Sequence, residues 1–153
     1  MKMLAKGILI MMLFALSGQS IAKDENIIDI FFKNRPPSQK VMGKLKPIME
    51  KYQEKYEVKY HLITDEKNAE IIKEYGLPTT HFPVAVVING KFRAKIDDKI
   101  VHFVHFPKFM EGIGRHEGDW SIDDVIKVLD DNSLLMEENI LPELEPATSE
   151  CQD

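Results

Sequence analysis

The stretch that decides the fold begins with Ile27-Ile28-Asp29-Ile30-Phe31-Phe32, a run that is nearly all β-branched or aromatic, and ends with a second strand-like segment, Val58 to Ile63. Between them, Val41 to Tyr56 places apolar residues at spacings of three and four, which is typical of a helix that packs one face on a sheet. The sequence therefore predicts a β-α-β unit, with its first strand in the centre of a sheet and covered on both faces.

Downstream of this unit, local signals predict a short helix, a buried strand, two further strands and a final helix. They are expected at Ala69–Tyr75, Val84–Ile88, Lys91–Ile96, Ile100–Phe106 and Ile122–Leu129. Asn89-Gly90 predicts a tight hairpin turn, because both residues tolerate positive φ, and Asp97-Asp98 predicts a second one. Ser121 and Asp124 have the spacing of a capping box at the start of the last helix.

The first 22 residues have the features of a signal peptide. Lys2 and Lys6 precede an apolar run from Gly7 to Leu16, and Ser20-Ile21-Ala22 is a small-x-small cleavage site. The apolar run is too short to span a bilayer, although an uncleaved membrane anchor is the alternative. We expect a periplasmic or secreted protein with no stable membrane anchor after cleavage.

Length and composition predict one folded domain, residues 23–132, followed by a C-terminal extension, residues 133–153, that is partly disordered. The chain has 153 residues and one cysteine, Cys151, which has no internal partner for a disulfide. It carries 20 basic and 25 acidic residues and has no basic cluster, which argues against a nucleic-acid partner.

The order of the predicted elements, β-α-β-α-β-β-α, resembles the thioredoxin fold over Asn26 to Leu129. Local motifs carry the resemblance: Phe31-Phe32-Lys33-Asn34-Arg35 before a helix, Tyr75-Gly76-Leu77 at a helix end, Phe82-Pro83-Val84 entering a strand, and Asn89-Gly90-Lys91 in a hairpin. The resemblance implies a three-layer α/β sandwich with a mixed central sheet and flanking helices.

The chain departs from that family at the position of its redox motif. Thioredoxins have Cys-x-x-Cys where this chain has Pro36-Pro37-Ser38-Gln39. An alignment on Pro47, which resembles the proline within the family's active-site helix, moves the two cysteine positions to Gln39 and Met42. Thiol–disulfide exchange requires a thiolate, which neither alignment provides. We therefore expect a redox-inactive member of the superfamily.

The resemblance also implies a binding site for a protein or an extended peptide. Its expected residues are Arg35, Pro36, Pro37, Ser38, His81, Phe82 and Pro83. By resemblance to the family, the Phe82-Pro83 peptide bond is expected to be cis and to lie near the start of the first long helix. Main-chain pairing with a guest strand needs no cysteine. The alternative is that both proline-containing loops are only rigid turns.

The histidines raise a second hypothesis, a metal-binding protein. His102, His105 and His116 are the candidate ligands, with His81 and Met110 as further ones, and imidazole suits zinc or copper. However, residues three apart on a strand point to opposite faces, so His102 and His105 can share a metal only if the strand bends. The simpler interpretation has no cofactor.

Two histidines, His116 and His61, each have a separate interpretation. Arg115-His116-Glu117 places three ionisable side chains in a glycine-rich loop, and His116 could act there as a general acid or base. A surface loop in which Trp120 anchors the last helix is the alternative, and enzymatic activity is therefore not expected. His61 lies in the middle of a predicted strand and is interpreted as a surface or edge residue.

Overall fold

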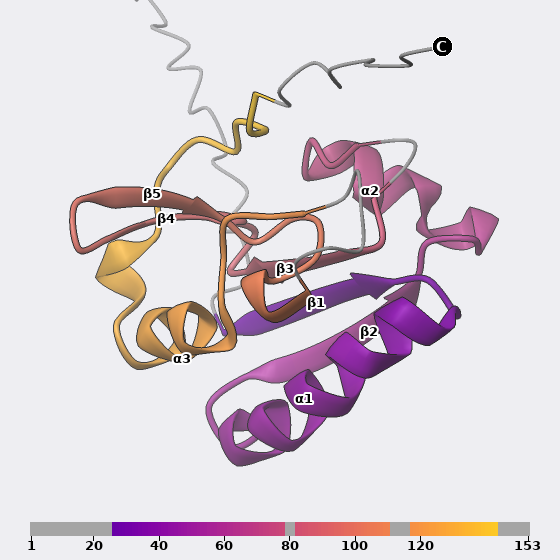
Figure 1. Ribbon diagram of the computed structural model, residues 1–153, viewed down its shortest axis with the longest axis horizontal. Coiled ribbons are helices and arrows are strands. Elements are labelled where there is room, and N and C mark those ends of the chain that lie inside the picture. Colours follow the sequence, from indigo (N-terminus) through magenta and orange to yellow (C-terminus); the bar gives the residue numbers. More distant parts are fainter. Residues whose placement is uncertain (1–25, 79–81, 111–116, 144–153) are drawn as a thin grey trace, which may run out of the picture.

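A computed structural model describes residues 26–78, 82–110 and 117–143. The protein is a mixed α/β fold built on a three-stranded sheet (Figure 1). Its helices and strands are β1 (Ile27–Phe32), α1 (Pro36–Tyr52), β2 (Glu57–Leu62), α2 (Ala69–Glu74), β3 (Val84–Ile88), β4 (Arg93–Ile96), β5 (Lys99–His102) and α3 (Ile122–Asp130). Short 3₁₀ turns occur at Glu66–Asn68, Lys108–Met110 and Asn132–Leu134.

The sheet has the strand order β2-β1-β3, so the predicted central strand is central. β2 runs parallel to β1, with Ile27 opposite Glu57, and β3 runs antiparallel, with Phe31 opposite Ala85. Every residue of β3 is buried, as the unbroken apolar run predicts. α1 and α3 lie on one side of the sheet and α2 lies on the other (Figure 1).

The segment after Asn89-Gly90 differs from the predicted arrangement, in which two hairpin turns join three consecutive strands. The turn forms with positive φ at both residues, but only Lys91 bridges back to Ile88. Lys91–Ile96 was expected to pair along β3. Instead β4 pairs with β5 in a separate two-stranded sheet, closed by Asp97 and Asp98, which both have positive φ.

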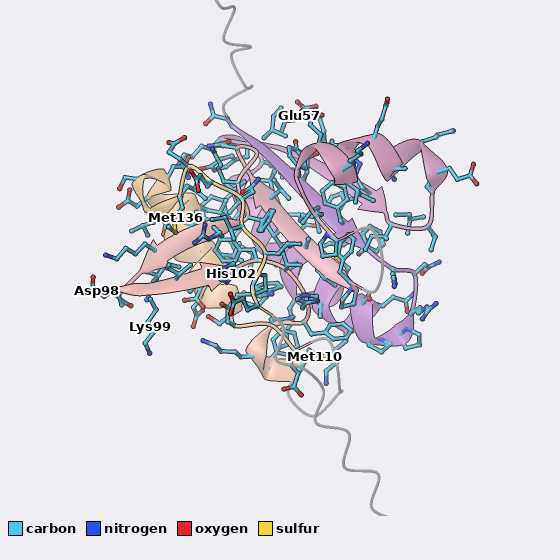
Figure 2. All side chains as sticks on the ribbon, turned by 90° about the horizontal axis from the view of Figure 1, so that it is seen from above. Glu57, Asp98, Lys99, His102, Met110 and Met136 are labelled. Atoms are coloured by element: carbon cyan, nitrogen blue, oxygen red, sulfur yellow. The ribbon has the colours of Figure 1, made fainter. Side chains whose placement is uncertain are left out.

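β5 also ends earlier than the predicted strand from Ile100 to Phe106, because the chain crosses to β3 after His102. There the Phe103 carbonyl accepts a hydrogen bond from the Val86 N–H (2.8 Å), and Val104 bridges to Ala85. The hairpin tip at Asp98 and Lys99 projects from the body of the molecule (Figure 2).

Two helices begin at residues that favour a helix start. α1 begins at Pro36, with prolines at its first two positions, where a missing N–H costs no intrahelical bond. It ends at Tyr52 rather than at the predicted Tyr56 and contains Pro47 in its interior. The capping box of α3 is confirmed, because the Ser121 hydroxyl accepts from the Asp124 N–H while the Asp124 carboxylate accepts from the Ser121 N–H.

The start of the C-terminal extension packs on the β4 side of the molecule. The Met136 N–H donates to the Arg93 carbonyl (2.9 Å), and Leu135 bridges to Ala94. The Asn139 side chain accepts from the Phe92 N–H (3.0 Å) and donates to the Tyr75 and Gly90 carbonyls. Residues 144–153, and with them Cys151, lie outside the described residues.

Across residues 26–78, 82–110 and 117–143, no helix combines the length and the apolar character needed to cross a membrane.

Candidate functional site

The turn between β1 and α1 contacts the start of β3 through one carbonyl group. The Pro83 carbonyl accepts hydrogen bonds from the Lys33 N–H (3.1 Å) and from the Ser38 hydroxyl (3.2 Å). Ser38 is 2% exposed, so its hydroxyl has no route to solvent and serves to join the two segments. The structure thus brings together Ser38 and Pro83, which the sequence suggested for one site.

The other residues predicted for this site divide into an outer and an inner group. Arg35 and Pro36 are exposed and Pro37 is half-buried, whereas Phe82 is fully buried. Next to the outer group, the Gln39 side-chain amide donates to the Asn34 side-chain oxygen (2.7 Å). His81 lies outside the described residues.

The turn has little capacity to hold an anion through its backbone. Arg35 is the N-cap of α1 and makes no side-chain capping bond, and the next two residues are prolines, which have no N–H to offer. Its positive charge comes instead from side chains, since Arg35 is exposed, Lys33 is half-buried and the first turn of α1 contains no acidic residue.

The expectation of a cis bond at Phe82-Pro83 is wrong. The described residues contain no cis peptide bond, so this one is trans, the form that X-Pro bonds favour by about 0.5–1 kcal/mol. In this trans geometry the Pro83 carbonyl already reaches both Lys33 and Ser38, and no bend of the cis type is needed to join β3 to the turn.

The candidate metal ligands are not assembled among the described residues. His102 and His105 lie on either side of the crossing from β5 to β3, and His105 is buried with a positive φ. His116 and Arg115 lie outside the described residues. Within the described ranges, no group of three or more histidine, cysteine, aspartate or glutamate side chains could hold a metal ion.

His102 nevertheless has a fixed orientation. The Asp119 carboxylate accepts both the His102 backbone N–H and, at 2.8 Å, its ring Nδ1–H. A carboxylate on one ring nitrogen fixes the tautomer and leaves Nε2 with the lone pair that a metal or a proton can take. His102 is the last residue of β5, at the opposite end of that strand from the hairpin tip at Asp98 and Lys99 (Figure 2).

A buried polar cluster that the sequence interpretation missed lies between the sheet and α2. Asp29, at the centre of β1, is 1% exposed, and both of its carboxylate oxygens are engaged. His61 Nε2 lies 2.7 Å from Oδ1, and the Tyr75 hydroxyl donates to Oδ2 at 2.6 Å. The only clue in the sequence is a single aspartate in an otherwise apolar strand.

The hydrogen bonds of this cluster continue beyond Asp29. The Asn68 side-chain amide donates to the Leu62 carbonyl (2.9 Å), and its oxygen lies 3.2 Å from His61 Nδ1. Each ring nitrogen of His61 thus faces a side-chain oxygen, one of Asn68 and one of Asp29. Burial and then the bond to Asp29 raise the pKa of Tyr75, so that its phenol stays protonated and donates.

This cluster joins β1, β2 and the two ends of α2. Both ring nitrogens of His61 and both oxygens of Asp29 are engaged, and the His61 ring also stacks on Phe31 with a centroid separation of 4.7 Å. His61 does lie on the outer strand β2, as expected of an edge residue, but its ring faces inward and ties β2 to β1 and α2.

No protein-family model matches this sequence, and comparisons with curated proteins and with solved structures also find no match.

Proposed function

We propose that the chain is an exported thioredoxin-like domain that has no dithiol redox chemistry and binds a protein or an extended peptide. The contact of the β1–α1 turn with the residue that enters β3 carries this proposal. A hydroxyl, Ser38, makes the contact, and its partner is a backbone carbonyl. A hydroxyl held in this way is too weak an acid to replace a thiolate, so the turn is left with a binding role.

The partner we propose is an extended segment with acidic character. The exposed surface of the turn presents Arg35 and Pro36, with Lys33 beside them and Lys40 on the next turn of α1. Because the first turn of α1 contains no acidic residue, this surface is positively charged, and positive charge favours encounter with acidic segments.

The experiment selects random phage-displayed peptides against the purified, processed protein and measures the affinity of the enriched peptides. We expect acidic peptides to be enriched and Arg35→Ala to weaken them about tenfold. Lys51→Ala, on an exposed residue at the far end of the same helix, is the matched control. Enrichment of peptides without acidic character, or equal effects of both variants, would contradict the proposal.

The redox part of the proposal has its own assay. The protein should fail to reduce the disulfides of insulin in the presence of dithiothreitol at rates above the uncatalysed reaction. Catalysis of that reduction would refute the redox-inactive assignment, whatever the peptide selection gives.

A second candidate function, binding of zinc or copper(I), is favoured by the carboxylate-oriented ring of His102. Calorimetric titration of the protein with each metal, in parallel with His102→Ala, tests it. Tight binding that the substitution abolishes is the expected result, and no heat of binding in the unaltered protein ends this candidate.

A further inference from the structure

A strip of exposed residues continues from the turn between β1 and α1 along the helix. Pro36, Lys40 and Lys44 follow one another at intervals of four residues, and all three are exposed. Residues four apart in a helix are neighbours on its surface, so the three side chains form one continuous strip. The basic surface of the turn therefore extends to Lys44, about 12 Å along the helix from Pro36.

This strip leads to an exposed aromatic ring that comes from another part of the chain. Lys44 Nζ lies 5.1 Å from the centre of the Phe109 ring, and Phe109 is 38% exposed. Phe109 belongs to the 3₁₀ turn Lys108–Met110, whose last residue is labelled in Figure 2. Met110 is buried, and the Lys108 N–H donates to the carbonyl of the buried Trp120 (2.8 Å). The ring is therefore held in place although part of it faces solvent.

The stretch of chain that forms the strip carries charge of one sign. From Ile30 to Met49 the sequence has five basic residues and no acidic one, whereas the whole chain has a formal net charge of −5. In the described part of the chain, Arg35, Lys40 and Lys44 belong to no ion pair. Their charges are available to a partner, and an acidic segment complements them.

We propose that the acidic segment bound at the turn also carries an aromatic residue, which packs on the Phe109 ring. This inference rests on the proposed function, because it adds a second contact for the same peptide. A carboxylate of the segment meets Arg35 and Lys40, and the aromatic residue lies beyond them at the end of the strip. Pairs of aromatic rings pack offset or edge to face, which adds to the free energy gained by burying their apolar surface.

The length of the strip sets the distance between the two contacts. An extended peptide advances about 3.3 Å per residue, so a segment of about four residues spans the strip from Pro36 to Lys44. The acidic and the aromatic residue of the partner should therefore lie about four residues apart in its sequence. A shorter side chain in place of the aromatic one would leave the exposed part of the Phe109 ring in water.

The test repeats the phage selection in parallel against the unaltered protein and against Phe109→Ala. We expect the unaltered protein to enrich peptides with an aromatic residue about four residues from an acidic one. Phe109→Ala should still enrich acidic peptides, but without the aromatic residue. Ile100→Ala, which removes another exposed large apolar side chain, on β5, is the matched control and should enrich the same peptides as the unaltered protein.

The affinities of one enriched peptide and of its form with alanine in place of the aromatic residue complete the comparison. Phe109→Ala should weaken the aromatic peptide about tenfold and change the affinity of the alanine form little, because the two rings act as a pair. Phe109→Tyr, which keeps a ring at this position, should restore the binding. Circular dichroism of each variant ensures that the comparison is made between folded proteins.

Enriched acidic peptides without an aromatic residue at this distance, or an equal loss of affinity for both peptide forms in Phe109→Ala, would overturn the inference and leave the proposed function standing. A selection that enriches no acidic peptide would overturn both. A dimer that Phe109→Ala dissociates in sedimentation equilibrium would also overturn the inference, because a second copy of the chain would then cover the ring.

Discussion

Asp29 is a carboxylate in the middle of an apolar strand, and its two partners come from β2 and from the end of α2. A buried group of this kind is tolerated because each oxygen receives a hydrogen bond. The local sequence specifies the strand, but only the folded arrangement provides the partners. Asp29 therefore connects the central strand β1 to β2 and to the end of α2.

Removing the Asp29 side chain should be costly, because it leaves the ring of His61 and the hydroxyl of Tyr75 buried without their acceptor. We expect Asp29→Ala to lower the free energy of unfolding by about 3 kcal/mol in urea denaturation. Glu54→Ala, on an exposed residue in the turn after α1, should change it by less than about 0.5 kcal/mol. Similar losses in the two variants would contradict a structural role for the cluster.

Substitution by alanine should change the stability of the fold in opposite directions at Gly118 and at Gly43. A Cβ at Gly118 would lie 2.6 Å from the Val104 carbonyl oxygen and 2.8 Å from that of Phe106, whereas a Cβ at Gly43, within α1, would meet nothing within 4 Å. We expect Gly118→Ala to destabilise the fold by about 2–3 kcal/mol and Gly43→Ala to stabilise it by about 1 kcal/mol. Thermal unfolding of both variants checks the signs, and equal shifts would refute the close approach at Gly118.

At the scale of elements, α1 and α3 are joined by a polar contact as well as by the core. The Tyr52 hydroxyl donates to the Asp130 carboxylate (2.7 Å), and the Tyr56 hydroxyl and Lys55 ammonium donate to the Leu129 carbonyl. These bonds fix the end of α1 against the end of α3 on the same side of the sheet.

This contact has a pH dependence with a definite sign. The hydrogen bond to Asp130, with burial and the charge of Asp130, raises the pKa of Tyr52 from 10.0 to about 12. Because the folded-state pKa is the higher one, the stabilisation is complete below pH 10.0 and is lost as the pH rises through about 12. In ultraviolet titration, Asp130→Ala should move the ionisation of one phenol down toward 10.0. Superimposable titration curves would contradict this assignment.

At the scale of the whole molecule, the C-terminal segment acts as a strap across the β4 side. Asn139 alone bonds three backbone groups, at the end of α2, in the turn after β3 and just before β4. Segments that are far apart in the sequence thus meet at one side chain. The apolar residues Leu134, Leu135 and Met136 indicated a docking turn after α3, and Leu135 and Met136 do contact β4. Nothing in the sequence pointed to the contacts of Asn139, and the acidic, proline-containing stretch from Glu143 onward is typical of disorder.

We expect Asn139→Ala to lower the free energy of unfolding by about 2–3 kcal/mol, since it removes three hydrogen bonds between the Asn139 side chain and the backbone. Glu143→Ala, on an exposed residue further along the same segment, is the matched control and should be nearly neutral. Chemical denaturation measures both. A neutral Asn139→Ala would mean that the strap does not support the fold.

The elements that sequence analysis located correctly are those with strong local signals. β3 follows from an unbroken apolar run, β1 follows from a run that only Asp29 interrupts, and α3 follows from the spacing of Ser121 and Asp124.

The hairpin that Asp97-Asp98 predicts between β4 and β5 is confirmed. The predicted pairing of the segment after Gly90 with β3 was wrong beyond the bridge of Lys91 to Ile88, because a turn signal fixes a reversal but not how far the two strands stay paired.

In the candidate site, too, some features follow from the local sequence and others depend on how distant segments fold together. The helix start at Pro36 is a local property and could be predicted, whereas the burial of Ser38 against the Pro83 carbonyl depends on where β3 lies. The cluster around Asp29 depends on three elements at once. Its only local trace was one charged residue in an apolar strand, which sequence reasoning passed over.

The turn after β3 has one further consequence, for the chemical ageing of the protein. Asn89 accepts the N–H groups of Asn26 and Ile27 and donates to the side-chain oxygen of Asn132, so a single amide spans the start of β1 and the segment after α3. Asparagine followed by glycine is prone to spontaneous loss of ammonia. The reaction passes through a cyclic imide, which opens to aspartate or, with a rerouted main chain, to isoaspartate. In the aspartate product the carboxylate would still accept from the two N–H groups but could no longer donate to Asn132, so the aged protein would keep the contacts at the start of β1 and lose the link to the segment after α3.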